Sequence, residues 1–421
     1  MRAVEKYLKQ HPLALIDTPP NVKLGIIVTI PAFNEAEAIK SLESLLACTK
    51  TETAIEIIVN VNFSEEVADE SKHFNKVSYR ILKQFAKQNS NEQFKIHVLY
   101  FPNQDAKKAG VGWARKQIMD EAFRRLLSVN NENGIITGFD ADSTCRTNYF
   151  IELEKFFNKK PKAKACSIKF EHKIEGEKYS ANIYHAIALY ELHLRYFINA
   201  QKLTGTPYAF QTVGSSFAVR AVYYAQVNGM SPKKAGEDFY FLQKIIALGE
   251  FYQLNTSCVY PSSRISNRVG FGTGPSVGEI SKTGEKLSYN LKSFLELKKL
   301  YDQLPSIYEN KIDIEDLPLD ALFISYLKKQ NAKQVVQNLR RNNKDFTKFR
   351  MAFLQWFGGF QILKVLNILA SSEAYKYTDV IESVNQLKII KESNNVFELL
   401  KQIRILDASE DYSGSSSSSS L

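Results

Sequence analysis

The sequence is poor in cysteine and histidine, and this scarcity narrows the kinds of site it can build. It holds four cysteines and six histidines among 421 residues. The cysteines are widely scattered and none belongs to a CxxC pair, so the pattern indicates neither a zinc site nor a disulfide framework. Free thiols of this kind fit a reducing compartment. The four are Cys48, Cys145, Cys166 and Cys258.

Long apolar runs are also missing. No stretch approaches the roughly 18 consecutive apolar residues of a membrane span, and the first residues are charged throughout, without the apolar core of a signal peptide. The nearest approach, 351–370, is interrupted by polar residues, and we interpret it as a buried helix. Contact of this stretch with lipid is the open alternative. We therefore expect a cytoplasmic protein, with peripheral contact at the inner face of the membrane as that alternative.

Several familiar nucleotide-binding patterns are absent. There is no G-x-x-x-x-G-K-[ST], so P-loop chemistry has no support, and the Gly-rich stretch 105–117 carries Arg115 where a dinucleotide fingerprint needs Gly or Ala. The chain has neither a compact Lys/Arg run nor a nucleic-acid-binding signature, so nucleic acid is not an expected partner. Its formal net charge of +10 still suits an anionic ligand or an anionic surface.

What is present is an alternation of short apolar runs with helical patterns through the first part of the chain. Strands alternating with helices predict βαβ units, and hence a parallel sheet with helices on both faces. The fold class we expect is α/β, a Rossmann-like, mostly parallel sheet flanked by helices. The strands are expected at 24–30, 54–61, 94–101 and 134–139, and the helices at 35–48, 66–89 and 112–128.

The second part of the chain is less regular and then becomes helical. We expect a strand at 164–170, a long helix at 180–201, a strand feeding a helix over 212–224, a helix at 236–248 and a strand that leaves into the Arg-bearing loop within 257–274, with helical periods only from about residue 285. The expected parts are an N-terminal segment 1–22, an α/β domain 23–280 with halves 23–145 and 146–280, a helical C-terminal region 281–410, and a disordered Ser-rich tail 411–421.

Two aspartates, Asp140 and Asp142, follow the apolar strand expected at 134–139. If the chain stays extended there, residues i and i+2 point to the same side, and the two carboxylates repel each other unless a cation lies between them. Oxygen ligands without His or Cys partners suit Mg²⁺ or Mn²⁺, ions that also take phosphate oxygens. The pattern therefore predicts a metal–diphosphate site. A turn or helix-cap pair is the alternative, and for so short a motif taken alone it is the commoner one.

A second acidic pair, Glu237 and Asp238, stands where a helix is expected to begin. The positive end of the helix dipole stabilises an ionised carboxylate there, and a carboxylate within reach of a substrate hydroxyl can act as a general base. A simple preference for acids in the first turn is the alternative. Because loops at the carboxyl ends of parallel strands share one edge of the sheet, we expect ligand-binding residues to gather at that edge.

The stretch "DAKKAGVGWARKQ" (105–117) is a third candidate element. Gly110 and Gly112 allow the backbone to approach a ligand closely. Lys107, Lys108 and Arg115 could neutralise a phosphate group.

These motifs, in this order, resemble the family 2 glycosyltransferases. "IIVTIPAFNEAEAIKSLESLL" is similar to the family's opening, "KAGVGWARKQ" to its second block, "GFDADS" to its DxD metal motif, and "VGSSFAVRAVYYAQVNGMSPKKAGEDFYFLQKI" to its acceptor-side block that ends in Glu-Asp. The resemblance covers roughly residues 22–275. Each motif is weak alone, but the ordered set is fairly specific.

The resemblance implies a GT-A fold and metal-dependent transfer of a sugar, with inversion, from a nucleotide-sugar donor to a carbohydrate or lipid-linked acceptor, in glycan or cell-envelope polysaccharide synthesis. It implies Mn²⁺ or Mg²⁺ on Asp140 and Asp142, and Asp238 as the base with Glu237 beside it. The residues that it places around the donor are Pro31, Phe33, Asn34, Glu35, Lys108, Gly110, Arg115 and Asp140.

The sequence also departs from the family pattern. The second strand normally ends in an acidic turn that meets the nucleobase, whereas Asn60 and Asn62 stand here; Asn62 is the candidate for that contact. The Gln-x-x-Arg-Trp block of processive relatives is missing. Instead, "SSRISNRVGFGTG" carries Arg264 and Arg268, and we hypothesise that one of them stabilises the leaving diphosphate. An ordinary surface loop is the alternative.

Two other functions stay open at this point. One is a non-catalytic nucleotide- or carbohydrate-binding protein on a degenerate GT-A scaffold, which the two asparagines motivate. The other is a nucleotidyltransferase, but these begin with a Gly-rich, Arg/Lys-bearing loop after the first strand, and "PAFNE" (31–35) has none. The sequence does not indicate the sugar, the acceptor or the oligomeric state.

Overall fold

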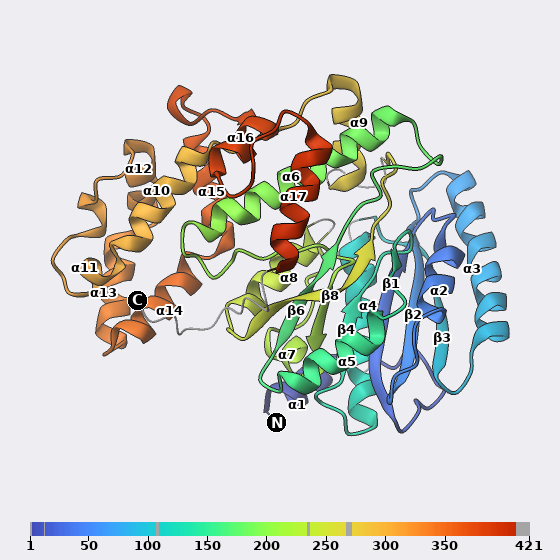
Figure 1. The fold of residues 1–421 in the computed structure, drawn as a ribbon. Helices are drawn as coiled ribbons and strands as arrows, with labels where there is room; N and C mark the ends of the chain where they lie inside the picture. The colour runs from blue at the N-terminus through green and yellow to red at the C-terminus, as the bar shows by residue number, and fades with distance from the viewer. Residues whose placement is uncertain (1, 12, 107–108, 234–235, 267–271, 410–421) are drawn as a thin grey trace.

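A mixed eight-stranded sheet forms the centre of the computed structural model, which describes residues 2–11, 13–106, 109–233, 236–266 and 272–409 (Figure 1). The strand order is β3-β2-β1-β4-β7-β6-β8-β5, and a separate pair, β10-β9, lies in the C-terminal region. The strands are β1 (Leu24–Ala32), β2 (Ala54–Ser64), β3 (Phe94–Gln104), β4 (Ile135–Gly138), β5 (Thr144–Cys145), β6 (Ala165–Phe170), β7 (Phe217–Arg220), β8 (Phe251–Tyr260), β9 (Leu287–Ser288) and β10 (Thr378–Asp379).

Two strands of the sheet, β7 and the edge strand β5, run antiparallel to their neighbours. β3, β2, β1 and β4 are parallel neighbours, whereas β7 runs antiparallel to both β4 and β6. β6 and β8 are again parallel to each other. The carboxyl ends of β1, β2 and β4 therefore share one edge, which is where ligands bind in open α/β sheets.

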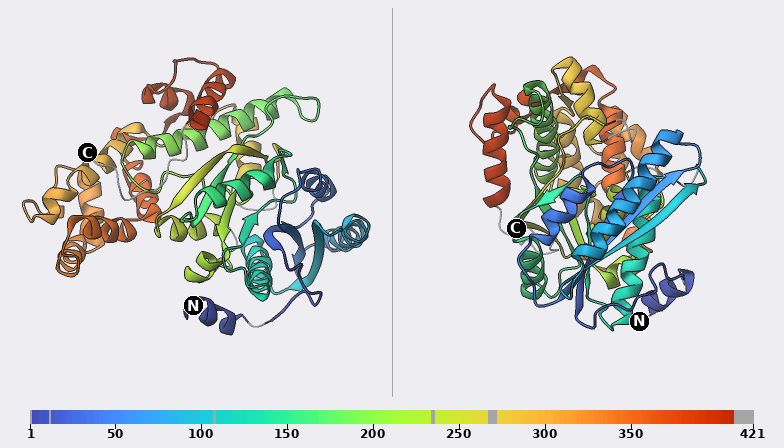
Figure 2. Two further views of the ribbon diagram at one scale, coloured as in Figure 1. Left: turned by 60° about the horizontal axis from the view of Figure 1, so that its bottom comes forward. Right: turned by 90° about the vertical axis from the view of Figure 1, so that its right-hand side faces the viewer.

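Helices cover both faces of this sheet, as the views in Figure 2 show. The helices are α1 (Arg2–Gln10), α2 (Ala38–Leu46), α3 (Asp69–Asn89), α4 (Val111–Ser128), α5 (Tyr149–Lys159), α6 (Ala181–Lys202), α7 (Ala221–Gln226), α8 (Glu237–Ile246), α9 (Thr273–Thr283), α10 (Leu291–Asp302), α11 (Leu304–Tyr308), α12 (Ala321–Lys329), α13 (Ala332–Asn342), α14 (Phe346–Trp356), α15 (Gly359–Leu369), α16 (Val380–Leu387) and α17 (Val396–Ser409), with short 3-10 turns at Ile314–Asp316 and Glu373–Tyr375.

Two apolar cores result from the alternation of side chains along β1 and β2. Ile26 and Val28 point into a core shared with α2, α3 and α5, whereas Ile27 and Ile58 point into a core shared with α4 and α6. The second core is continuous with the helices α10 to α17. The predicted α/β architecture, with its helical C-terminal region, is confirmed.

The sequence patterns missed several elements. α1, α5 and the short strands β5, β9 and β10 were not expected, and the region after residue 285 is not purely helical because β9 and β10 pair there. α1 lies against α4 and α7 because the Tyr7 hydroxyl donates to Asp120 at 2.6 Å, and Tyr224 donates to the same carboxylate oxygen at 2.5 Å. Such polar anchors are formed between distant residues and leave no local periodicity.

The stretch 351–370 is not one helix, contrary to the prediction. α14 ends at Trp356 and α15 begins at Gly359, and their axes differ by 62°. Gly359 comes so close to α8 that an added Cβ would lie 2.1 Å from Oε1 of Gln243. In the described part of the chain no single helix is long and apolar enough to cross a membrane, and α14 with α15 is the one bent pair that passes by length and composition.

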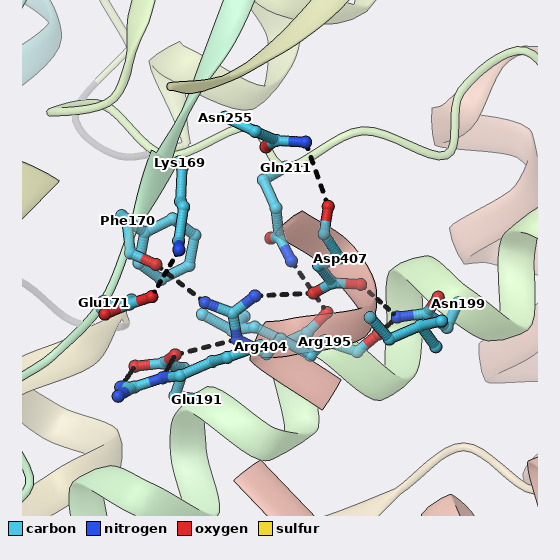
Figure 3. Close-up of polar contacts among 12 residues, drawn as sticks. Lys169, Phe170, Glu171, Glu191, Arg195, Asn199, Gln211, Asn255, Arg404 and Asp407 are labelled. Atoms are coloured by element: carbon cyan, nitrogen blue, oxygen red, sulfur yellow. Dashed lines mark hydrogen bonds and ion pairs between the residues drawn. The ribbon is translucent and has the colours of Figure 1, made fainter. Parts of the chain in front are cut away.

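A buried charge network fastens the last helix to the body of the protein (Figure 3). Glu191 on α6 accepts from Arg195 at 2.8 Å and from Arg404 on α17 at 2.6–2.7 Å. Arg195 also donates to Asp407 at 2.6 Å, and Asn255 on β8 donates to the main-chain oxygen of Asp407 at 3.0 Å. α17 is therefore held by two ion pairs, Arg404 with Glu191 and Asp407 with Arg195, in addition to its apolar contacts.

Candidate functional site

The turn after β4 carries the two aspartates of the DxD pattern. β4 ends at Gly138, and the chain then turns so that the N–H of Ser143 donates to the main-chain oxygen of Asp140 at 3.0 Å. The prediction assumed an extended chain through Asp140 and Asp142, and that assumption is wrong because the strand stops before them. The two carboxylates lie on one tight turn, but each has a different cationic partner.

Arg115 is the partner of Asp140. It lies in the first turns of α4, its side chain is only 4% exposed, and Nη2 forms a short ion pair with Oδ1 of Asp140. Its Nε donates to Oε1 of Glu237 at 3.0 Å, and Nη1 donates to the carbonyl oxygen of Gly214 at 3.0 Å. One buried guanidinium thus joins the β4 turn, the start of α8 and the loop before β7.

Glu237 and Asp238 are the first two residues of α8, as the sequence predicted. Burial raises the pKa of Glu237 to about 7, against the opposing effect of Arg115. Burial likewise raises the pKa of Asp238, and the neighbouring Asp140 raises it further, while Arg115 lowers it. The N–H of Phe239 donates to Oδ1 of Asp238 at 2.7 Å, which fixes the orientation of that carboxylate.

Gly214 is a site residue that the sequence analysis did not single out. An added Cβ there would lie 2.6 Å from Nη2 of Arg115 and 3.0 Å from Oδ2 of Asp238. Any side chain at this position would force this guanidinium and this carboxylate to shift. The stretch "VGSS" (213–216) gives no sign of this role, because the two side chains that it accommodates belong to other segments, on α4 and α8.

Arg264 forms an ion pair with Asp142. Its Nη2 lies 3.0 Å from Oδ2 of Asp142 and forms a short ion pair with Oε2 of Glu35, and its Nη1 donates to Oε1 of Glu35 at 3.2 Å. Glu35 is 3% exposed. The loop after β8 therefore reaches back to the loop after β1. A further ion pair, Lys178 with Glu37, joins the loop after β1 to the segment between β6 and α6.

The segment "PAFNE" includes the end of β1 and the turn that follows it. Pro31 is the penultimate residue of β1, and Phe33 follows the strand; both are half-buried. Asn34 adopts a left-handed conformation (φ 49°), its N–H donates to Oδ1 of Asn75 on α3 at 2.9 Å, and its Oδ1 accepts from Nδ2 of Asn75 at 2.6 Å. Asn34 therefore shapes the turn, whereas its predicted contact with a nucleoside stays a prediction, as do those of Pro31 and Phe33.

The asparagines of β2 are both buried. Asn60 is 0% exposed and its Nδ2 donates to the carbonyl oxygen of Ala114 at 3.2 Å, so it packs against α4 next to Arg115. Its Oδ1 is buried without a hydrogen-bond partner among the described residues. Asn62 is 5% exposed and pairs in register with Phe101 of β3. Both lie at the expected sheet edge, and recognition of a nucleobase by Asn62 stays a prediction.

The glycines of "KAGVGWARKQ" serve the packing of α4. Gly110 caps α4 in an extended conformation (φ 164°) that other residues also adopt. An added Cβ on Gly112 would lie 2.0 Å from the main-chain oxygen of Lys233, so this glycine permits close contact with the segment before α8. The predicted approach of Gly110 and Gly112 to a ligand stays a prediction. Lys107, Lys108 and Arg268 lie outside the described residues.

The two aspartates of the β4 turn fit a divalent cation in chemistry. Carboxylate oxygens are the ligands that Mg²⁺ and Mn²⁺ prefer, and the side chains of Asp140 and Asp142 are 35% and 18% exposed. In the described part of the chain no group of three or more His, Cys, Asp or Glu side chains could hold a metal ion. The remaining ligands would therefore be water and phosphate oxygens, which is the usual arrangement for Mg²⁺.

No protein-family model matches the chain, and no curated protein matches it. Among solved structures, residues 1–349 of TarS from S. aureus in complex with UDP-GlcNAc align at 12% identity and a TM-score of 0.40, over 91% of this chain and 88% of that one. The mannosyltransferase PcManGT from Pyrobaculum calidifontis, in complex with GDP-Man and Mn²⁺, aligns at 12% identity and a TM-score of 0.34, over 96% and 92%.

Proposed function

We propose that this chain is a glycosyltransferase of the GT-A type, which moves a sugar from a nucleotide-sugar donor to a hydroxyl group of an acceptor. One observation carries the proposal: Asp140, Glu237 and Asp238, from segments about a hundred positions apart, meet around the buried guanidinium of Arg115. They do so beside the carboxyl ends of β1 and β4, the edge at which open α/β sheets bind ligands. The order of the sequence motifs supports the same assignment.

On the donor side, the chain supplies two guanidinium groups close to one turn. Arg115 is held rigidly by its three partners, and Arg264 lies over Asp142 and Glu35. Preorganised positive charge of this kind stabilises the negative charge that builds on a departing diphosphate. A divalent cation, Mn²⁺ or Mg²⁺, on Asp140 and Asp142 would supply further charge neutralisation of the same group when bound.

On the acceptor side, Asp238 is the base. Its carboxylate is fixed by the N–H of Phe239, and its raised pKa strengthens it as a proton acceptor. Asp238 takes the proton of the acceptor hydroxyl, whose oxygen attacks the anomeric carbon as the diphosphate leaves. With one base and a direct displacement, the anomeric configuration inverts.

The acceptor is proposed to be a carbohydrate or a lipid-linked glycan, in glycan or cell-envelope polysaccharide synthesis. The location that goes with it is cytoplasmic, with peripheral contact at the inner face of the membrane. The bent pair α14 and α15, with Met351 41% and Phe360 43% exposed, is the surface that would make that contact.

The experiment that tests the proposal measures release of nucleoside diphosphate from a panel of nucleotide sugars with Mn²⁺. We expect Asp238→Asn to abolish turnover while it preserves donor binding, and Asp142→Ala to abolish both. Asp69→Asn, at an exposed ion pair on α3, is the control that should keep both. Turnover by Asp238→Asn at the wild-type rate would contradict the proposal. Donor binding without turnover in the wild type, with any acceptor, would favour the non-catalytic alternative.

A further inference from the structure

Arg264 forms an ion pair with Asp142, one of the two aspartates that a bound cation would need. It comes from the loop after β8, 122 positions beyond Asp142, and its Nη2 lies 3.0 Å from Oδ2 of that aspartate. We propose that Arg264 is a built-in competitor of the divalent cation: it holds Asp142 while the site is free of metal and turns to the diphosphate of the donor when metal binds. This inference rests on the proposed function.

The competition follows from charge and distance. A Mg²⁺-type cation lies about 2.0–2.1 Å from a carboxylate oxygen, so it would lie within a few ångströms of a guanidinium that contacts the same carboxylate. Like charges at such short range repel strongly where water is partly excluded. Asp142 is only 18% exposed and Arg264 22%. Arg264 and the cation therefore compete for the charge of Asp142, and binding of the cation weakens the ion pair.

Glu35 keeps the released side chain in the site. It meets the guanidinium through both carboxylate oxygens, one at 3.2 Å from Nη1 and one in a short ion pair with Nη2. A two-point contact of this geometry is stronger and more directional than a single one. Glu35 is 3% exposed, so it stays buried beneath the guanidinium. Arg264 can thus give up its ion pair with Asp142 and still be held at the site by Glu35.

The guanidinium also has a donor that the described residues leave unused. Nε of Arg264 is buried and has no hydrogen-bond partner within the described part of the chain. Buried donors are normally satisfied, and arginine presents its N–H groups in a fork that matches phosphate oxygens. An oxygen of the donor diphosphate would complete this set.

Arg115 shows by contrast what a fixed arginine looks like in the same site. Its Nε, Nη1 and Nη2 all have partners, including the main-chain oxygen of Gly214, and its side chain is 4% exposed. Arg264 has the larger exposed fraction and the unused donor. Of these two arginines, only Arg264 is built to exchange partners.

The test uses Arg264→Gln, which removes the charge but can still donate to Glu35. We expect the variant to bind Mn²⁺ alone about tenfold more tightly than the wild type, followed by the electron paramagnetic resonance of free Mn²⁺. We expect it to bind UDP or GDP about tenfold more weakly at saturating Mn²⁺, because a hydrogen bond from a charged group has been lost. If Arg264 had only a structural role, the substitution would weaken the binding of Mn²⁺ and of the nucleotide alike. A gain in Mn²⁺ affinity together with a loss of nucleotide affinity therefore distinguishes the proposed competition.

Arg146→Gln is the matched control. Arg146 is exposed, follows Asp142 closely on the chain and donates to the hydroxyl of Tyr260 at 3.1 Å. Its loss removes one positive charge nearby and keeps the ion pair between Arg264 and Asp142. An equal gain in Mn²⁺ affinity in this control, or an unchanged or lower affinity in Arg264→Gln, overturns the inference. Failure of both the wild type and Arg264→Gln to bind Mn²⁺ also overturns the inference. The transferase proposal is judged separately, by donor turnover in the wild type.

Discussion

At the scale of single residues, one buried guanidinium joins parts of the chain that are far apart in sequence. Arg115 touches the β4 turn, α8 and the loop before β7. The sequence marked it only as the residue that breaks a dinucleotide fingerprint and as a cation near the donor. Its three partners could not be predicted, since they depend on where β4, β7 and α8 meet in space.

Replacing Arg115 by alanine should destabilise the protein by about 3–5 kcal/mol, because Asp140 and Glu237 lose their buried counter-charge. Urea unfolding measures this. Lys155→Ala, at an exposed helix pair with Glu152, is the control and should cost less than about 1 kcal/mol. Equal stability of Arg115→Ala and the wild type would show that these pairs contribute little.

Gly214→Ala should lower donor turnover strongly, with a smaller effect on stability. The added Cβ would lie 2.6 Å from Nη2 of Arg115 and 3.0 Å from Oδ2 of Asp238, so the guanidinium and the base must both shift. Gly278→Ala on α9, where the nearest atom would lie 3.1 Å away, is the control. Wild-type kcat in Gly214→Ala would mean that this spacing does not matter for the chemistry.

Glu237 gives a pH dependence whose sign follows from its pKa of about 7, raised by burial. The folded state binds this proton more tightly than the unfolded state, so the stabilisation is fully present below about pH 4.5 and is lost as the pH rises through about 7. Glu237→Gln mimics the protonated form. The free energy of unfolding of the wild type should therefore fall relative to that of Glu237→Gln between pH 5 and pH 8, in urea titrations. A relative gain would mean that Arg115 keeps this carboxylate ionised throughout.

At the scale of elements, α17 is attached to α6 through a buried charge network (Figure 3). Glu191 is fully buried and accepts from Arg195 and Arg404, and these cations hold its pKa well below the usual range despite the opposing effect of burial. A carboxyl group whose pKa is lower in the folded than in the unfolded state stabilises the fold at pH values above its unfolded-state pKa. This stabilisation is lost as the pH falls through its folded-state pKa. α17 should therefore loosen on acidification.

Arg404→Ala should detach α17 at neutral pH. The change leaves Glu191 with one guanidinium fewer in a dry environment, which costs about 3–5 kcal/mol for a broken buried pair. Hydrogen–deuterium exchange should rise over Val396–Ser409 and far less in β1. Lys401→Ala, exposed on the same helix, should leave the exchange unchanged. If exchange over α17 were the same in Arg404→Ala as in Lys401→Ala, apolar contacts would be what holds the helix.

Elements with strong local periodicity were predictable, and those held by distant contacts were not. The strands that became β1 to β4 and the helices that became α2 to α4 were predicted from apolar runs and stripes. The break between α14 and α15 was missed because Gly358 and Gly359 sit in a mostly apolar stretch that was interpreted as one buried helix. β9 and β10 were missed because two-residue strands leave no period to read.

At the scale of the whole molecule, connectivity alone predicted that the loops at the carboxyl ends of the strands gather at one edge of the sheet. The loops after β1 and β4 and the start of α8 do converge there through ion pairs. The chain order could not show that the site divides into two charge clusters, one around Arg115 and one around Arg264. That division follows from the turn after Gly138, which sends Asp140 and Asp142 to different partners.

The measurement that bears most directly on the central claim is the melting temperature of the wild type and of Asp142→Asn with a panel of nucleotide sugars and Mn²⁺. A ligand that binds the folded state raises the stability. The account predicts that at least one nucleotide sugar raises the melting temperature of the wild type only with Mn²⁺ present, and that Asp142→Asn abolishes this shift. An absence of any shift across the panel, or an equal shift in Asp142→Asn, would contradict it.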